Sequence, residues 1–453
     1  MDLQGKKVLV AGCGKSGLGA AGLLKKTGAC PVLFDENDGI DKESLTGRAD
    51  YPADVPLVLG RLDEKLIGEL SLAVISPGIS IEEPFVERLR SAGVPIWGEV
   101  ELAWQFGKGR LIAITGTNGK TTTTALVGEI LKSFFSSAFV VGNIGTPYTG
   151  EALKMTEQSA TVAEISSFQL ETIMDFKPNV SVILNITPDH LDRHGTMETY
   201  TQIKECITMN QTEEDTVVLN FDDPILKEFG KKEGLKPKVI WFSSKESLKD
   251  GFFLKGEEII YAKAGKETVL LNVKELQLLG QHNYENVMAA SAMAYAYGVP
   301  IEVIRKNLLT FPGVEHRIEF VAEKRGVLYY NDSKGTNPDA AIKGIQAMNR
   351  PTILIGGGYD KDSEYDEWIK AFDGKVRKLV LLGATREKIA QSAHANGFDD
   401  IIMADTFEEA FEQCVKYAKP GDAVLLSPAC ASWGMFKNYE ERGRVFKECV
   451  MAL

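Results

Sequence analysis

The chain has 453 residues, of which 44% are hydrophobic and 25% charged, and its formal net charge is −12. This length exceeds what one hydrophobic core supports, so roughly two to four domains are expected. The acidic balance argues against a general binder of nucleic acids or anionic membranes, because both usually carry a basic patch.

Six cysteines are scattered along the chain without a C-x-x-C pair, which indicates neither a zinc site nor a disulfide framework. The N-terminus shows no signal-peptide pattern and enters a predicted strand directly. No apolar run approaches the roughly 18 residues needed to cross a bilayer. We therefore expect a reduced, cytoplasmic enzyme with no nucleic-acid partner and no membrane partner.

The first hundred residues alternate strand-like and helix-like patterns. Short β-rich runs end in turn residues, and a helical pattern lies between the first two: "KVLVAG", "CPVLFD", "LAVISPG" and, for the helix, "GLGAAGLLKKTGA". This order predicts β-α-β units of a doubly wound parallel sheet.

A glycine-rich turn follows the first predicted strand. Gly12, Gly14 and Gly17 fit the pattern G-x-G-x-x-G, and Asp35 follows the second strand at about the spacing of a ribose-binding acid. Taken alone, the motif indicates NAD. The loop itself only presents a helix N-terminus to a phosphate, however, so any nucleotide diphosphate satisfies it.

Neighbouring side chains add to this phosphate-binding character. Lys15 and Ser16 place a charge and a hydroxyl where a diphosphate would lie, and no dehydrogenase motif follows. Ser76, in the "ISPGIS" loop after another strand, is a candidate ligand contact at the same sheet edge, with an ordinary turn as the alternative.

A second α/β unit begins at "RLIAITG" and contains a second phosphate loop, "AITGTNGKTT". An apolar strand feeds a Gly-rich turn, and Lys120 and Thr121 open a helix, which suits phosphate oxygens and Mg²⁺. The standard spacing fails, because Ile114 stands where a glycine is expected and the first loop glycine is Gly116. The alternative is a Gly- and Thr-rich helix start without a ligand.

Acidic and histidine side chains follow the next strands of this unit. Glu164 ends an apolar strand, where a carboxylate near a phosphate loop suits Mg²⁺ and a capped loop is the alternative. A dense group after the following strand also indicates metal or anion binding: Asp189, His190, Asp192 and His194. Lys204 lies on a predicted helix, where a solvent-facing lysine is the default expectation.

A third α/β unit follows Pro312–Gly313, a predicted hinge. Its predicted strands are "GVLYYNDS", "PTILIGG", "KLVLLG" and "DAVLLSP". The sequence thus predicts an α/β protein of three domains. They are an N-terminal Rossmann-like domain at 1–98, a central P-loop-type ATPase domain at 99–312 and a C-terminal Rossmann-like domain at 313–453.

Motifs spread in order over almost the whole chain resemble the Mur ligase family of bacterial cell-wall synthesis. They are "TGTNGKTT", "EISSFQLE", "NITPDHLDRHG", "GQHNYENVMAA", "EHRIE", "NDSKGTNPDA", "GGGYDKDSEYD" and "LLSPACASWGMFKNYEERG". The last three most resemble the D-glutamate-adding member, and the "DNPR" motif of a diaminopimelate-adding member is absent.

This resemblance implies that the first domain binds the UDP of a sugar nucleotide rather than NAD. It implies that the middle domain binds ATP and that the third binds the incoming amino acid. The implied activity is the ATP-dependent ligation of D-glutamate to UDP-N-acetylmuramoyl-L-alanine through an acyl phosphate. The implied cofactors are ATP, two Mg²⁺ ions and a CO₂-derived carbamate on Lys204, and a monomer is expected.

The resemblance also implies a role for individual residues. The UDP-substrate positions are Lys15, Ser16, Asp35, Ser76, Asn143 and His190. The ATP positions are Gly116, Thr117, Asn118, Gly119, Lys120, Thr121, Thr122, Asn283, Asn286, Arg317, Asp332 and Lys334. The D-glutamate positions are Thr336, Lys361, Ser432 and Tyr439. The metal positions are Thr121, Glu164, His190 and carbamylated Lys204, and the catalytic positions are Lys120, His190 and Lys204.

Some positions depart from the family pattern. Glu36 and Asn37 replace more favourable uracil or phosphate partners of some members. Trp433 and Tyr439 stand where some members carry Leu and Phe, which we expect to alter packing rather than chemistry. Alternatives from other classes are a folylpolyglutamate synthase-like ligase without the leading domain, a hydride-transfer enzyme and a non-catalytic nucleotide-binding module.

Overall fold

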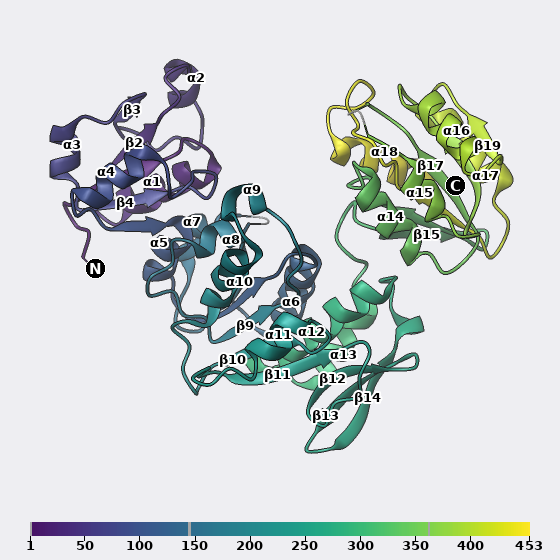
Figure 1. Ribbon diagram of the computed structural model, residues 1–453, viewed down its shortest axis with the longest axis horizontal. Helices are drawn as coiled ribbons and strands as arrows, with labels where there is room; N and C mark the ends of the chain where they lie inside the picture. The colour runs from purple at the N-terminus through teal and green to yellow at the C-terminus, as the bar shows by residue number, and fades with distance from the viewer. Residues whose placement is uncertain (1, 144–145, 361–362) are drawn as a thin grey trace. The chain divides into compact units, whose positions relative to one another are not determined.

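Three sheets form the framework of the protein in a computed structural model that describes residues 2–143, 146–360 and 363–453 (Figure 1). The chain divides into two compact units, Met1–Leu270 with Asn286–Asn307 and Leu271–Glu285 with Leu308–Leu453. The mixed α/β architecture confirms the predicted fold class. Within the described ranges no helix is both long enough and apolar enough to cross a membrane.

The first sheet is fully parallel and has the strand order β3-β2-β1-β4-β5. Its elements are β1 (Lys7–Ala11), α1 (Lys15–Lys26), β2 (Cys30–Asp35), α2 (Lys42–Thr46), β3 (Leu57–Leu59), α3 (Glu64–Glu69), β4 (Leu72–Ile75), α4 (Pro84–Ser91), β5 (Ile96–Gly98) and α5 (Glu99–Phe106).

Helices cover both faces of this sheet because the strands are apolar on both sides. Val8 and Val10 of β1 pack in the hydrophobic cluster that includes α1 and α5. Leu9 and Ala11 of the same strand pack in the opposite cluster, which includes Phe85 of α4. Alternating side chains therefore bury both faces, as is typical of parallel sheets.

The strand order reverses beside β1, so the loops after β1 and β4 meet at the switch point where α/β sheets bind ligands. Gly12 has a φ of +97°, and a Cβ on Gly17 would collide with the Gly12 carbonyl oxygen. A Cβ on Gly12 would lie 2.6 Å from the Ser76 hydroxyl oxygen. The glycine turn is thus closed against Ser76, and only residues without side chains fit it.

The second sheet has the strand order β14-β13-β12-β11-β10-β9-β6-β8-β7. Its elements up to β10 are β6 (Arg110–Thr115), α6 (Lys120–Phe134), β7 (Ala138–Gly142), α7 (Tyr148–Glu151), η1 (Ala152–Lys154), β8 (Ala160–Glu164), α8 (Ser167–Leu170), β9 (Val180–Ile183), α9 (Leu191–His194), α10 (Met197–Glu205), η2 (Cys206–Thr208) and β10 (Thr216–Asn220). The later elements are α11 (Pro224–Phe229), β11 (Lys238–Ser243), β12 (Gly251–Lys255), β13 (Glu258–Lys263), β14 (Lys266–Asn272), η3 (Val273–Glu275), α12 (Gln281–Tyr297) and α13 (Ile301–Thr310).

Strand β6 lies between β8 and β9, and all three are parallel. The carboxyl ends of parallel strands meet at one edge of a sheet. The phosphate loop after β6, Glu164 at the end of β8 and the His190 segment after β9 therefore lie at the same edge. This sheet position explains why residues far apart in the sequence converge.

The third sheet has the strand order β15-β16-β20-β17-β18-β19, with β15 antiparallel to β16. Its elements are β15 (Glu319–Lys324), β16 (Val327–Asn331), α14 (Pro338–Ala347), β17 (Thr352–Gly356), α15 (Asp366–Lys370), β18 (Val376–Leu381), α16 (Arg386–Ala395), β19 (Ile401–Met403), α17 (Phe407–Tyr417), β20 (Ala423–Leu426) and α18 (Tyr439–Met451).

Two hydrophobic clusters flank this sheet. One contains α14, α15 and α16 residues around Trp368, and the other contains α17 and α18 residues around Phe446. Strand β20 lies between β16 and β17, so the segments that leave these strands, 332–336, 427–432 and 357–358, gather at one edge. Those segments carry two of the four predicted amino-acid-binding residues, Thr336 and Ser432.

A buried carboxylate fastens α5 to the second sheet. Glu101 is 0% exposed, and its side chain accepts hydrogen bonds from three successive backbone N–H groups. The donor–acceptor distances to Oε2 are 2.8 Å from Met174, 3.2 Å from Asp175 and 3.0 Å from Phe176. The segment before β9 thus depends on one acidic side chain for its backbone hydrogen bonds.

Replacing this carboxylate should destabilise the first unit. Glu101→Ala should lower the free energy of unfolding by about 3 kcal/mol or more, because it leaves buried N–H groups without an acceptor. Glu101→Gln keeps one acceptor oxygen, so its free energy of unfolding should fall by less. Urea unfolding followed by circular dichroism measures the difference.

The control is Glu129→Ala, which removes an exposed pair with Lys132 and should cost less than about 1 kcal/mol. Equal losses for Glu101→Ala and Glu129→Ala would show that the N–H groups of residues 174–176 do not depend on Glu101.

Candidate active site

The phosphate loop is built by two glycines in the left-handed half of backbone space. Gly116 has a φ of +146° and Gly119 a φ of +86°, and Gly119 directly precedes α6. A Cβ on Gly119 would collide with the side-chain oxygen of Asn286. The loop therefore packs against Asn286, one of the residues predicted to bind ATP, and it opens at a helix N-terminus suited to phosphate.

The threonine and asparagine of this loop anchor it to the segment after β9. The Thr117 hydroxyl donates to the Thr187 carbonyl at 3.1 Å and accepts from the Thr187 N–H at 3.0 Å. The Asn118 N–H donates to the Asn185 side chain at 2.8 Å. These contacts fix the loop to the segment that leads to His190.

Two lysine ammonium groups meet at one backbone oxygen. Lys120 donates to the Gly116 carbonyl at 2.8 Å and to the Thr117 carbonyl at 2.9 Å. Lys204, from α10, donates to the same Gly116 carbonyl at 3.0 Å. Two positive charges that share one acceptor repel each other. Loss of the positive charge from either lysine would therefore be electrostatically favourable.

Lys204 is buried rather than solvent-facing, so the default expectation for a helical lysine was wrong at this position. Its side chain is 1% exposed, and its ammonium lies 4.6 Å from the centre of the Tyr200 ring. Burial is the main cause that lowers its pKa to about 7, the Lys120 charge lowers it further, and Asp189 opposes the shift. The neutral amine is therefore accessible near physiological pH.

Glu164 has one carboxylate oxygen with a partner and one without. Asn143 donates to Oε1 at 2.9 Å, while the buried Oε2 has no hydrogen-bond partner among the described residues. A buried carboxylate oxygen without a partner is costly unless a cation or a donor satisfies it. Oxygen ligands suit Mg²⁺, so this carboxylate fits a magnesium site.

His190 is held in an uncommon backbone conformation. Its φ is +52°, it precedes α9, and its ring lies 4.8 Å from the ring of Phe168. In the described ranges no group of three or more His, Cys, Asp or Glu residues is arranged to hold a metal ion. The predicted metal set contains only two residues of those types, Glu164 and His190, beside a hydroxyl and a modified lysine.

Four of the six predicted UDP-binding residues lie at the switch point of the first sheet: Lys15, Ser16, Asp35 and Ser76. Asp35, at the end of β2, accepts the Cys13 N–H at 3.0 Å, which ties it to the glycine turn. Lys15 and Ser16 open α1. The Ser76 hydroxyl oxygen is buried and has no hydrogen-bond partner in the described structure. These side chains share one edge of the sheet, although Asn143 and His190 belong to the second sheet.

The second unit gathers another group of predicted residues. Asp332, at the end of β16, is buried, accepts the Ser427 hydroxyl at 2.7 Å and accepts the Ile318 N–H at 3.2 Å. Burial raises the pKa of its carboxyl to about 7, although these hydrogen bonds and the nearby Arg317 act in the opposite direction. Asp332 is therefore poised between its protonated and charged forms.

Lys334 lies beside Tyr439, with its ammonium 5.7 Å from the ring centre. Thr336 follows in the same turn, since its N–H donates to the Lys334 carbonyl at 2.8 Å. Ser432 is buried on the neighbouring segment. Lys361, also predicted to bind D-glutamate, lies outside the described residues, and Asn283 belongs to the second unit, where its side chain donates to the Leu279 carbonyl at 2.7 Å.

Sequence reasoning missed the arginine that fastens these segments together. Arg442 of α18 is 3% exposed and donates to the Ser333 hydroxyl at 2.9 Å, the Ser333 carbonyl at 2.8 Å and the Cys430 carbonyl at 3.1 Å. It thereby fixes the segments that carry Thr336 and Ser432. Its place in the "YEERG" run gave no sign of burial, because arginines on helices usually face solvent.

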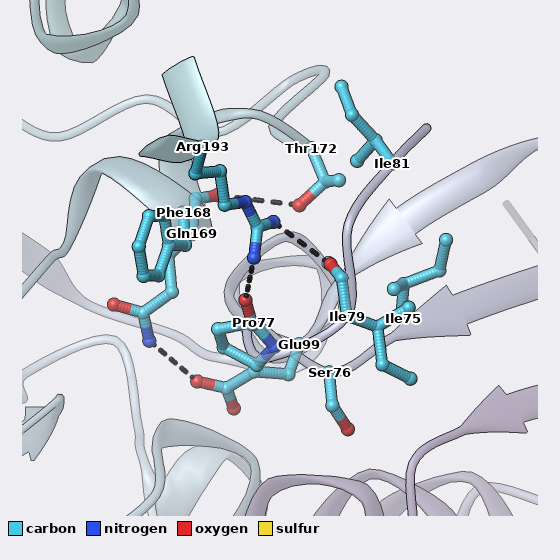
Figure 2. Close-up of a pocket in the computed structure, with 11 residues that line it drawn as sticks. Ile75, Ser76, Pro77, Ile79, Ile81, Glu99, Phe168, Gln169, Thr172 and Arg193 are labelled. Atoms are coloured by element: carbon cyan, nitrogen blue, oxygen red, sulfur yellow. Dashed lines mark hydrogen bonds between the residues drawn. The ribbon is translucent and has the colours of Figure 1, made fainter. Parts of the chain in front are cut away.

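Sequence reasoning also missed a second group, which Figure 2 shows around a pocket at the loop after β4. Arg193 donates to backbone oxygens of that loop, and Gln169 donates to Glu99 at 2.9 Å. Glu99 is 2% exposed, its other carboxylate oxygen has no partner in the described structure, and burial raises its pKa to about 7. Only the density of charged residues around His190 hinted at this group.

Comparison with protein families matches three successive models to the chain. They are the Mur ligase MurD-like N-terminal domain at residues 6–98, the Mur ligase middle domain at 114–294 and the Mur ligase glutamate ligase domain at 316–430. The chain belongs to the Mur ligase family. The resemblance inferred from its motifs is thus confirmed.

Relatives match over the full length. The UDP-N-acetylmuramoylalanine–D-glutamate ligase of Lachnoclostridium phytofermentans is 55% identical over 100% of this chain and 99% of its own. The ligase of the same name from Lachnospira eligens is 54% identical over 99% of each chain. The UDP-N-acetylmuramate–alanine ligase MurC of Thermotoga maritima has a TM-score of 0.58 at 21% identity over 99% of each chain, which shows the shared fold.

Glu99 makes a testable contribution to pH dependence. Its folded pKa lies above the ordinary value of 4.5, so the folded state binds its proton more tightly than the unfolded state between pH 4.5 and about 7. Ionisation of Glu99 should therefore cost stability as pH rises through this window, by about 3 kcal/mol at most, and no further above it.

Glu99→Gln removes this titration. The difference in unfolding free energy between variant and wild type should shift in favour of the variant from pH 5 to pH 8 and then level off, as measured by urea unfolding at each pH. A difference that stays constant over this range would mean that Glu99 titrates normally.

Proposed function

We propose that the protein is an ATP-dependent ligase that joins D-glutamate to UDP-N-acetylmuramoyl-L-alanine in peptidoglycan precursor synthesis. The observation that carries the proposal is the 55% identity, along the whole chain, to a UDP-N-acetylmuramoylalanine–D-glutamate ligase. The phosphate loop and the buried Lys204 beside it support the ATP-dependent half of the reaction.

The first half-reaction makes the L-alanine carboxylate reactive. A carboxylate oxygen attacks the γ-phosphorus of ATP, the bond to the β-γ bridging oxygen breaks, and ADP leaves with that electron pair. Lys120 and the N–H groups at the start of α6 offset negative charge on the phosphoryl oxygens. The product is an acyl phosphate, whose phosphate is a far better leaving group than an oxide ion.

The second half-reaction forms the amide. The D-glutamate amine attacks the acyl carbon, a tetrahedral intermediate collapses, and phosphate departs while the amine loses a proton. Thr336, Lys361, Ser432 and Tyr439 are proposed to bind D-glutamate, because its two carboxylates require cations and hydroxyls. Asn283, Asn286, Arg317, Asp332 and Lys334 are proposed to bind ATP together with residues 116–122.

Two magnesium ions would be held by Thr121 and Glu164 and by His190 and carbamylated Lys204. Magnesium supplies charge neutralisation for the phosphoryl oxygens and the acyl oxygen. The unpartnered Oε2 of Glu164 supports the first position. The residues 15, 16, 35, 76, 143 and 190 are proposed to bind the sugar nucleotide.

Carbamylation of Lys204 requires only CO₂ and a neutral amine. The ammonium first loses a proton; the lone pair of the neutral nitrogen then forms a bond to the carbon of CO₂ and a second proton leaves, so that the cation becomes a carbamate anion. Burial and the neighbouring Lys120 ammonium both favour loss of the positive charge. We further propose three domains at 1–98, 99–312 and 313–453, a monomeric state and a cytoplasmic location.

The proposed activity is tested by phosphate release from ATP. Release should require both UDP-N-acetylmuramoyl-L-alanine and D-glutamate, and L-glutamate or D-alanine should not replace D-glutamate. Lys120→Ala should lose more than about 100-fold in turnover while keeping its fold, because it removes the charge at the γ-phosphate. Phosphate release that does not require the sugar nucleotide, or normal turnover by Lys120→Ala, would rule out the proposed activity.

Lys204 makes a separate prediction. Lys204→Arg keeps a positive charge but cannot form a carbamate, so it should lose about 100-fold or more of turnover. Lys204→Ala should lose as much, and millimolar acetate should restore part of it by supplying a carboxylate in the vacated space. Wild-type protein depleted of CO₂ should regain activity with bicarbonate, more completely above pH 7 than below it, because the amine is then neutral.

Lys132→Arg is the matched control, since Lys132 is an exposed lysine of α6 and should tolerate the change. Carbon-13 NMR after addition of labelled bicarbonate should give a carbamate signal in wild type and none in Lys204→Arg. A Lys204→Arg variant as active as Lys132→Arg would exclude the carbamate.

A further inference from the structure

Arg193 connects the two sheets of the first unit. It lies on α9 and follows His190 in the same segment. Its guanidinium donates to the Pro77 carbonyl and to the Ile79 carbonyl, each at 2.9 Å, in the loop after β4 (Figure 2). The side chain therefore reaches from the edge of the second sheet to the switch point of the first.

The guanidinium is held in one orientation. It donates to the Glu171 carboxylate at 2.6 Å, and its carbon lies 4.3 Å from the centre of the Phe168 ring. Its side chain is 15% exposed and that of Glu171 is 5% exposed. Charge-assisted bonds and a stacked ring act on one planar group, so its position is strongly constrained.

Further contacts fix Glu171 itself. His194 lies 3.1 Å from the second Glu171 oxygen through Nδ1 and 3.0 Å from the Ser167 hydroxyl through Nε2. Ser167 begins α8, the helix that directly follows the Glu164 strand and also carries Phe168. The Arg193 network therefore includes α8, α9 and the loop after β4.

This network has a proposed ligand contact at each end. At one end the bonded loop begins with Ser76, whose hydroxyl lies against the glycine turn of the UDP-binding edge. At the other end, the Phe168 ring contacts both the Arg193 guanidinium and the His190 ring.

We propose that Arg193 is a positioning residue that sets the sugar-nucleotide loop and His190 in a fixed relation. This rests on the proposed function. UDP bound at the Ser76 loop then presents its attached acyl group to His190 at a distance set by the guanidinium. The substrate that this network would position is an anionic, nucleotide-linked carboxylate that contacts the edges of both sheets. A lysine cannot replace the arginine, because one ammonium cannot serve two carbonyls, a carboxylate and a ring in this planar geometry.

Two variants test the proposal, with wild type assayed beside them for phosphate release. Arg193→Ala and Arg193→Lys should each raise the KM for UDP-N-acetylmuramoyl-L-alanine at least about tenfold and lower kcat, because loss of charge-assisted bonds releases the loop. The KM for D-glutamate should change less than about twofold. Millimolar guanidinium should restore part of the activity of Arg193→Ala and none of that of Arg193→Lys, whose side chain occupies the space.

Arg88→Lys is the matched control. Arg88 of α4 also joins two segments through a planar fork, donating to the Leu62 carbonyl at 2.9 Å and to the Glu64 carboxylate, but it has no contact with α8 or α9 in the described structure. Its replacement should lower thermal stability and leave all three KM values within about twofold of wild type.

The outcomes separate the possibilities. If the Arg193 variants fold and keep the sugar-nucleotide KM within twofold, or lose kcat uniformly without guanidinium rescue, the positioning role is wrong. If Arg193→Ala does not fold, Arg193→Lys decides by the same criteria. If wild type releases no phosphate in response to the sugar nucleotide, the proposed function fails instead, which is a distinct result.

Discussion

The arrangement of the first unit depends on the Gly116 carbonyl oxygen, which accepts hydrogen bonds from both Lys120 and Lys204. Gly116 has a φ of +146°, in the half of backbone space that favours glycine. Two buried or half-buried ammonium groups on one oxygen are electrostatically costly. The cost is lowered when an anion binds between them or when one lysine loses its charge, and both events belong to the proposed reaction.

Other polar groups along the sheet edges are also buried in unfavourable surroundings. The free oxygen of Glu164, the hydroxyl of Ser76 and one oxygen of Glu99 are buried without partners in the described structure. These groups lose their hydration when the protein folds. A ligand that hydrogen-bonds to them therefore binds without a further desolvation penalty at these groups. Glu101 and Arg442, by contrast, are buried with hydrogen-bond partners in place.

The sequence predicted the α/β class, the two phosphate-type loops and the edge positions of Glu164 and His190, because strand–loop–helix order follows from local patterns. It could not reveal burial of polar side chains, which tertiary packing decides. Its place on a helix alone would put Lys204 in solvent, whereas the side chain is buried, and Arg193 and Arg442 went unnoticed because long-range contacts define their roles. The proposed assignments of ligand-binding residues rest on the family resemblance, which supplied what spacing alone could not.

In the proposed reaction, the loops at the carboxyl ends of the first two sheets activate the sugar-nucleotide carboxylate by phosphorylation before D-glutamate takes part. Borohydride reduces an acyl phosphate to an alcohol but leaves a carboxylate intact. The protein incubated with ATP, Mg²⁺ and UDP-N-acetylmuramoyl-L-alanine, without D-glutamate, and then treated with borohydride should yield the alaninol form of the sugar nucleotide by mass spectrometry. Absence of this product under conditions where addition of D-glutamate gives full ligation would contradict the account.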